Sequence, residues 1–166
     1  MKKIIVSIVL ALTLIAVMAV PAIAANEQSV GATVTVGEVV SITLTGGPIS
    51  FVGGIPGQVT DQGATGQTAL NPAIKVIVQA ETNVNVDIAI KGAATGALAL
   101  ENWKYTKTFT ETPTISIPAD YGTAVYSNVD DGENYFYHWV TIPGTTPAGD
   151  QGCTISYKAV KTGTGF

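Results

Sequence analysis

The chain has 166 residues, a formal net charge of −4 and an apolar fraction of 46%, which suits a single domain. Its basic residues are all lysines, so the basic patches needed to bind nucleic acid or an anionic membrane surface are missing. Cys153 is the only cysteine and His138 the only histidine, which excludes an intramolecular disulfide and a His/Cys metal cluster.

Residues 1–24 have the pattern of a secretory signal peptide. Basic Met1–Lys3 precedes the 17-residue run Ile4–Val20, which is apolar except for Ser7 and Thr13. Ala22-Ile23-Ala24 then supplies a small-x-small cleavage site. The alternative is an uncleaved membrane anchor, because 17 residues are near the lower limit for a span. We expect a signal-peptide helix, secretion to the extracellular cell surface, and a mature chain with six lysines, twelve acids and net charge −6.

The rest of the chain, residues 25–166, reads as one domain of short strands. Alternation of apolar and polar residues with a period of two predicts strands at 32–36, 38–45, 49–52, 72–80, 84–91, 113–117, 121–126, 135–142 and 153–160. Residues 53–71 form a long Gly-rich loop, and residues 97–105 are ambiguous between a helical turn and a strand. Short strands separated by turn signals predict an all-β fold, an antiparallel β-sandwich of immunoglobulin-like or jelly-roll type.

The residues that could carry chemistry form no catalytic pattern. His138 shares a strand face with Phe136 and Val140, so a core histidine is favoured over a catalytic one. Cys153 shares a face with Ile155 and Tyr157, so a buried thiol is favoured over intermolecular pairing. Asp130–Glu133 could contribute to a calcium site, but it lacks calcium-loop spacing and an acidic turn is favoured. The sequence therefore predicts no enzyme, no cofactor and no metal site.

An aromatic row is the most distinctive remaining feature. Tyr135, Tyr137 and Trp139 alternate along one face of a predicted strand. If exposed, they would stack on sugar rings or on another subunit. The alternative is that they belong to a core face or lie under the loop at 53–71.

One segment resembles the secreted β-sandwich domains of prokaryotes, many of them on archaeal surfaces. Val140–Gly149, with its Ile-Pro and Thr-Pro-Ala-Gly steps, is similar to the strand–loop–strand ending of those domains, and Val39–Phe51 is similar to their opening. Those domains usually have an aromatic residue soon after the Ala-Gly step, where this chain has Asp150–Cys153. The resemblance covers about a third of the chain. It implies a fold but not a function, since such sandwiches serve many roles.

A looser resemblance is to subunits of biofilm fibres and archaeal bundling pili, in which the N-terminal strand of one subunit completes the sheet of the next. The matching feature is Asn26–Val36, a polar leader followed by an isolated alternating strand between Gly31 and Gly37. The resemblance implies a donor strand whose inward side chains would be those of Val30, Ala32, Val34 and Val36. The alternative is an ordinary first strand paired within its own domain.

These observations lead to two hypotheses of function. The first is a secreted cell-surface structural protein, a filament, matrix or surface-layer subunit that forms a homo-oligomer or polymer through β-strand contacts. The second is a non-catalytic module that binds polysaccharide or another surface ligand. A hydrolase with two distant carboxylates ranks third, because no acid lies in a distinctive motif.

Overall fold

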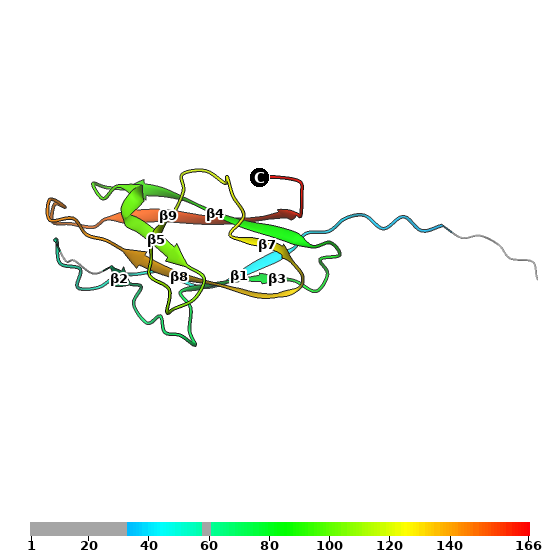
Figure 1. The fold of residues 1–166 in the computed structure, drawn as a ribbon, viewed down its shortest axis with the longest axis horizontal. Helices are drawn as coiled ribbons and strands as arrows, with labels where there is room; N and C mark the ends of the chain where they lie inside the picture. Colours follow the sequence, from blue (N-terminus) through cyan, green and yellow to red (C-terminus); the bar gives the residue numbers. More distant parts are fainter. Residues whose placement is uncertain (1–32, 58–60) are drawn as a thin grey trace, which may run out of the picture. The chain divides into compact units, whose positions relative to one another are not determined.

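The computed structural model of the chain describes residues 33–57 and 61–166 (Figure 1). It divides into two units, Met1–Val36 and Gly37–Phe166. The signal helix expected at residues 1–24 lies outside the described residues. Of the strand predicted at 32–36, residues 33–36 are described, and they have no strand assignment. All strands of the described chain belong to the second unit, and no helix in those residues is long and apolar enough to cross a membrane.

A larger antiparallel sheet forms one layer of the second unit. Its strands follow the order β1 (Ile42–Gly46), β3 (Ile74–Val78), β8 (Gly132–Val140), β5 (Trp103–Thr106) and β6 (Ile115–Ser116). The short strand β2 (Gln62–Gly63) also pairs with β8, beyond the end of β3. The central strand β8 is rich in aromatic residues, which favour the interior of a sheet.

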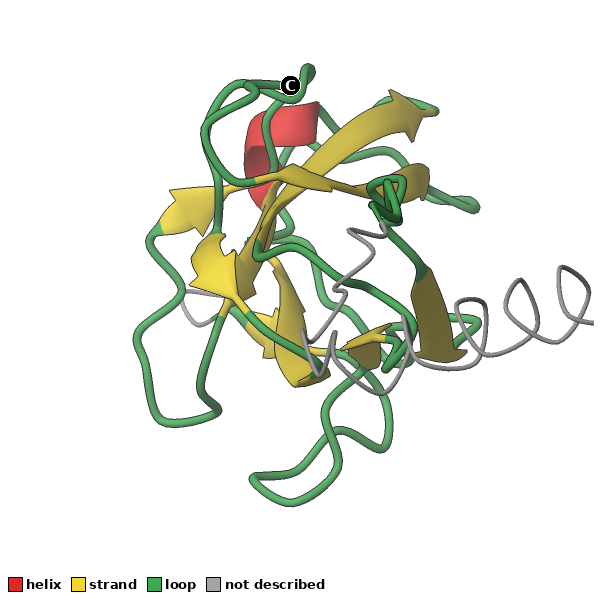
Figure 2. Ribbon diagram, turned by 90° about the vertical axis from the view of Figure 1, so that its right-hand side faces the viewer, coloured by secondary structure: helices red, strands yellow, loops and turns green. Residues whose placement is uncertain are grey.

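A smaller antiparallel sheet forms the other layer. Its order is β7 (Tyr126–Val129), β4 (Val86–Thr95) and β9 (Gly152–Lys161). Strands β4 and β9 pair over their full length, from Val86 opposite Lys161 to Thr95 opposite Gly152. A single turn of 3-10 helix, η1 (Leu100–Asn102), leads from this sheet into β5 and is red in Figure 2, where the strands are yellow.

The apolar faces of the two sheets contact each other. Phe136 of β8 is fully buried, and its ring lies 4.9 Å from that of Tyr157 on β9 and 5.4 Å from that of Tyr126 on β7. Alternate residues of β3 and β4 complete this core, and among them Val76 and Ile88 are 0% exposed. The arrangement is all-β and antiparallel, compatible with the predicted sandwich.

Several local predictions differ from the structure. The strand predicted at 121–126 is shifted, because β7 begins only at Tyr126, and the predicted loop at 53–71 contains the short strand β2. Residues 49–52 form no strand, although Ile49 and Phe51 still pack against the core. The ambiguous stretch 97–105 contains both alternatives, a helical turn followed by a strand. The strands predicted at 135–142 and 153–160 belong to opposite sheets, so the Pro/Gly-rich loop between them connects the two layers and contains no fully buried residue.

Candidate functional site

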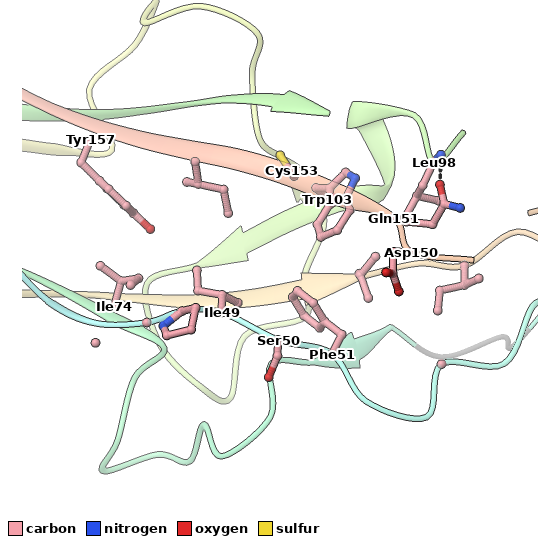
Figure 3. Close-up of a pocket in the computed structure, with 18 of the residues that line it drawn as sticks. Ile49, Ser50, Phe51, Ile74, Leu98, Trp103, Asp150, Gln151, Cys153 and Tyr157 are labelled. Carbon is pink, nitrogen blue, oxygen red and sulfur yellow. Dashed lines mark hydrogen bonds between the residues drawn. The ribbon is translucent and has the colours of Figure 1, made fainter. Parts of the chain in front are cut away.

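An apolar groove opens between β9 and the edge of the larger sheet that begins with β1. We use "the apolar groove" for a cavity of about 720 Å³ walled by β9 on one side and by β1 and the segment after it on the other. In Figure 3, Ile49 and Phe51 point into this space while Ser50 points away from it. Apolar side chains dominate the lining: Leu44, Pro48, Ile49, Phe51, Ile74, Leu98, Trp103, Val140, Ile142, Cys153, Ile155 and Tyr157.

Both walls of the groove are strand edges without a partner in the described part of the chain. Strand β9 pairs with β4 on one side, and β1 pairs with β3 on one side. No residue of β9 is fully buried, whereas β4 beside it buries Val86, Ile88 and Ile90. Unpaired edges present backbone N–H and C=O groups that can bind another strand.

The exposure of Leu44 shows that the smaller sheet does not cover the whole of the larger sheet at the groove. It lies opposite Val76 in the pairing of β1 with β3, so the two side chains share the face that turns toward the smaller sheet. Val76 is 0% exposed but Leu44 is 48% exposed. The smaller sheet therefore ends before it reaches β1.

The side chains of His138 and Tyr157 form a buried polar pair between the two sheets. His138 is 0% exposed, and its Nε2 lies 2.7 Å from the hydroxyl oxygen of Tyr157. Burial lowers the pKa of His138 to about 4 and raises the pKa of Tyr157. The imidazole is therefore neutral at neutral pH. The pair contains no third group of a catalytic triad, and it fixes the groove residue Tyr157 to the larger sheet.

The only cysteine lies in the groove wall. Cys153 is half-buried, not fully buried as a core thiol would be. Burial raises the pKa of the Cys153 thiol above its ordinary value. The thiol form is therefore favoured over the nucleophilic thiolate.

The predicted aromatic row is largely covered. Tyr137 is 3% exposed and donates a hydrogen bond from its hydroxyl to the Ala69 carbonyl at 3.0 Å. Trp139 is half-buried, and its Nε1 donates to the Thr106 hydroxyl at 3.0 Å. The ring of Phe109, from the loop after β5, lies 5.8 Å from both the Tyr137 and the Trp139 rings. Tyr135 alone is exposed, at 38%, so the three rings form no open platform.

The predicted donor segment is described only at its C-terminal end. Val30 and Ala32 lie outside the described residues. Val34 and Val36 are 82% and 73% exposed. Two valines of the alternating pattern are thus accessible to a partner.

The charged side chains near the aromatic row form ion pairs. Lys104 lies 2.9 Å from the Asp61 carboxylate, which also accepts a hydrogen bond from the Thr141 hydroxyl. Glu133, at the end of the acidic turn, pairs with Lys75 at 3.1 Å. Across residues 33–57 and 61–166, no three His, Cys, Asp or Glu side chains gather closely enough to hold a metal ion. These contacts join distant segments, so sequence spacing could not have indicated them.

Comparison with protein-family models, with curated proteins and with solved structures finds no match to this chain.

Proposed function

We propose that this protein is an exported, non-catalytic structural subunit of the cell surface, and that copies assemble through β-strand contacts. The observation that carries the proposal is the pair of unpaired edges, β1 and β9, on either side of the apolar groove. A monomeric protein usually protects such edges with charge, proline or a covering segment. Leu44 of β1 and Ile155 of β9 leave apolar surface along the part of these edges that lines the groove, whereas the two exposed lysines of β9, Lys158 and Lys161, lie outside it.

The signal-peptide pattern supports the same proposal from the sequence. Export would place the chain where filaments, matrices and surface layers are built. A β-sandwich of moderate negative charge, rich in Thr and Gly, would remain soluble until its edges met another copy. Strand addition uses backbone hydrogen bonds for affinity and alternate side chains for specificity, so it needs no catalytic residues.

The test is direct imaging of the mature chain. Protein beginning at Ala25 is purified, concentrated and examined by negative-stain electron microscopy and sedimentation velocity. We expect filaments or a concentration-dependent series of oligomers. A chain that stays monomeric at every concentration and shows no assemblies contradicts the proposal.

The alternative, a polysaccharide-binding module, would need an aromatic surface. Trp139→Ala should then weaken retention on immobilised glycans while the fold is kept, with Tyr135→Ala as the comparison at the exposed ring. The cover of Tyr137 and Trp139 by Phe109 gives this alternative less support than the groove gives to assembly.

A further inference from the structure

Trp103 carries a buried hydrogen-bond donor, its Nε1, that has no acceptor among residues 33–57 and 61–166. The residue is 6% exposed and lines the apolar groove. The chain's other tryptophan is satisfied, because Trp139 Nε1 donates to the Thr106 hydroxyl at 3.0 Å. A buried indole N–H usually has a partner, since a buried donor without one costs free energy. The Trp103 donor is therefore a polar group in the groove that a ligand could satisfy.

The polar side chain at this end of the groove is already committed to other bonds. Figure 3 shows Trp103 at the end of the groove where Leu98, Asp150 and Gln151 also lie. The Gln151 Oε1 atom accepts from the backbone N–H groups of Ala97 and Leu98, at 2.7 and 2.9 Å. A carbonyl oxygen has two lone pairs, so both acceptor positions of Gln151 are in use.

The rest of the groove is suited to an apolar chain. Its volume of about 720 Å³ falls within the range of about 300–1,000 Å³ that is usual for small-molecule sites. In Figure 3, Ile74 and Tyr157 lie at the opposite end of the groove from Trp103. The Phe51 ring meets the Trp103 ring edge to face, with their centroids 5.8 Å apart, which fixes the position of the donor. One donor at one end and apolar walls along the rest match a ligand with an apolar chain and an accepting oxygen.

The charge of the groove favours a neutral ligand. Asp150 is the one charged residue among the described residues that line it, and the whole chain has a net charge of −4. None of the lysines in the described part of the chain lines the groove to pair with a carboxylate or a phosphate. An anionic group beside Trp103 would lose its hydration and face the Asp150 carboxylate.

We propose that the apolar groove binds a free, neutral small molecule of the acyl-ester class, whose carbonyl oxygen accepts a hydrogen bond from Trp103 Nε1 while its chain packs along the groove. Such a ligand contacts side chains and uses no backbone N–H or C=O group of the β1 and β9 edges. The inference goes beyond the proposed function, and each can fail without the other.

The two indole N–H groups allow a direct test by NMR, because the chain contains two tryptophans. The purified chain, labelled with a nitrogen isotope and kept dilute enough to be monomeric, is titrated with methyl octanoate. We expect the Trp103 indole signal to shift. The Trp139 signal should stay in place, since its N–H is already bonded to Thr106. The Trp103→Phe variant assigns the two signals, because it retains only that of Trp139.

Isothermal titration calorimetry then compares affinities. Sodium octanoate has the same chain with a charged end, so it should bind roughly tenfold or more weakly than the ester. Trp103→Phe keeps an aromatic ring but removes the donor, so its affinity for the ester should fall by about 3- to 10-fold, the range for one neutral hydrogen bond. Ile155→Trp, at a half-buried position of the groove wall, should abolish binding by filling the groove. Thr154→Trp is the matched control on the opposite face of β9 and should bind normally.

Several outcomes would overturn the proposal. An unmoved Trp103 signal, or equal shifts of both indole signals, excludes a specific site at Trp103. Octanoate that binds as tightly as its methyl ester contradicts the neutral ligand class, and unchanged affinity in Trp103→Phe contradicts the hydrogen bond. If that variant does not fold, the two strand variants decide, since equal binding by Ile155→Trp and Thr154→Trp excludes the groove. Protein that floats with neutral phosphatidylcholine vesicles but does not bind the free ester recognises a bilayer instead.

Discussion

The Nε2 atom of His138 on β8 lies 2.7 Å from the hydroxyl oxygen of Tyr157 on β9, across the interface between the two sheets. Neither residue is near the other in sequence, and each comes from a different layer. The hydrogen bond therefore ties the wall of the groove to the larger sheet. Its loss should affect both stability and the shape of the groove.

Replacing Tyr157 with Phe should lower the free energy of unfolding by about 1–3 kcal/mol, because the buried His138 nitrogen loses its partner and cannot reach water. Urea denaturation measures the change. Tyr121→Phe is the control, since the Tyr121 ring packs on Phe166 at the surface of the molecule. Equal stability in the Tyr157→Phe variant and the original chain would contradict the hydrogen bond's role.

Stability should fall as the pH drops below about 6.5. The unfolded histidine has a pKa near 6.5, whereas burial lowers the pKa of His138 in the folded state to about 4. Between these values the unfolded state binds a proton that the folded state does not, so acid favours unfolding. The loss should reach roughly 2 kcal/mol by pH 5, at about 1.4 kcal/mol for each pKa unit.

Urea denaturation at several pH values between 7.5 and 5 measures this dependence. His138→Gln is the matched control, because glutamine does not titrate there. The variant should be less stable at neutral pH but should lose the slope between pH 6.5 and 5. An unchanged slope would assign the pH dependence to other groups.

Leu44→Lys should reduce assembly at least tenfold while leaving the monomer folded. Leu44 is 48% exposed in the single copy, so a lysine there is solvated, but an added strand would have to bury its charge. Thr43→Lys is the control on the adjacent, exposed position of β1, whose side chain points to the opposite face. Sedimentation velocity at matched concentrations compares the two, and equal assembly would exclude the groove as the contact.

Phe109→Ala should expose Trp139 to solvent. The Phe109 ring covers both Tyr137 and Trp139, so its loss should raise acrylamide quenching of tryptophan fluorescence and cost about 1–2 kcal/mol of stability. Phe166→Ala is the control, because that ring stacks on Tyr121, whereas the aromatic neighbours of Trp103 and Trp139 are Phe51 and Phe109. Quenching that rises equally in both variants would show a general loosening of the fold.

Alternation along the chain was sufficient to predict most strands but not their partners. The patterns at 84–91 and 153–160 correspond to β4 and β9, which pair over their full length. That β9 lies at an edge depends on how many strands the other segments contribute, and no local pattern encodes this number. The sequence therefore predicted the strands without indicating that β9 lies at an edge.

The aromatic row illustrates a similar limit. Alternation placed Tyr135, Tyr137 and Trp139 on one face, and Phe136 and His138 on the other, as the structure has them. Their exposure depends on Phe109, which lies about 30 residues away in a loop without periodic pattern. Phe109 covers these rings because of the path that its loop takes, and the spacing of residues along the chain does not determine that path.

The half-buried thiol of Cys153 has a practical consequence for native material. If copies assemble into a linear fibre through the apolar groove, as the proposed function allows, each neighbour would cover this thiol, and a maleimide dye would reach it only on the terminal copy with a vacant groove. The labelled fraction would then equal the reciprocal of the mean number of copies per fibre. A single unaltered side chain could thus count fibre ends, and so follow growth and breakage over time.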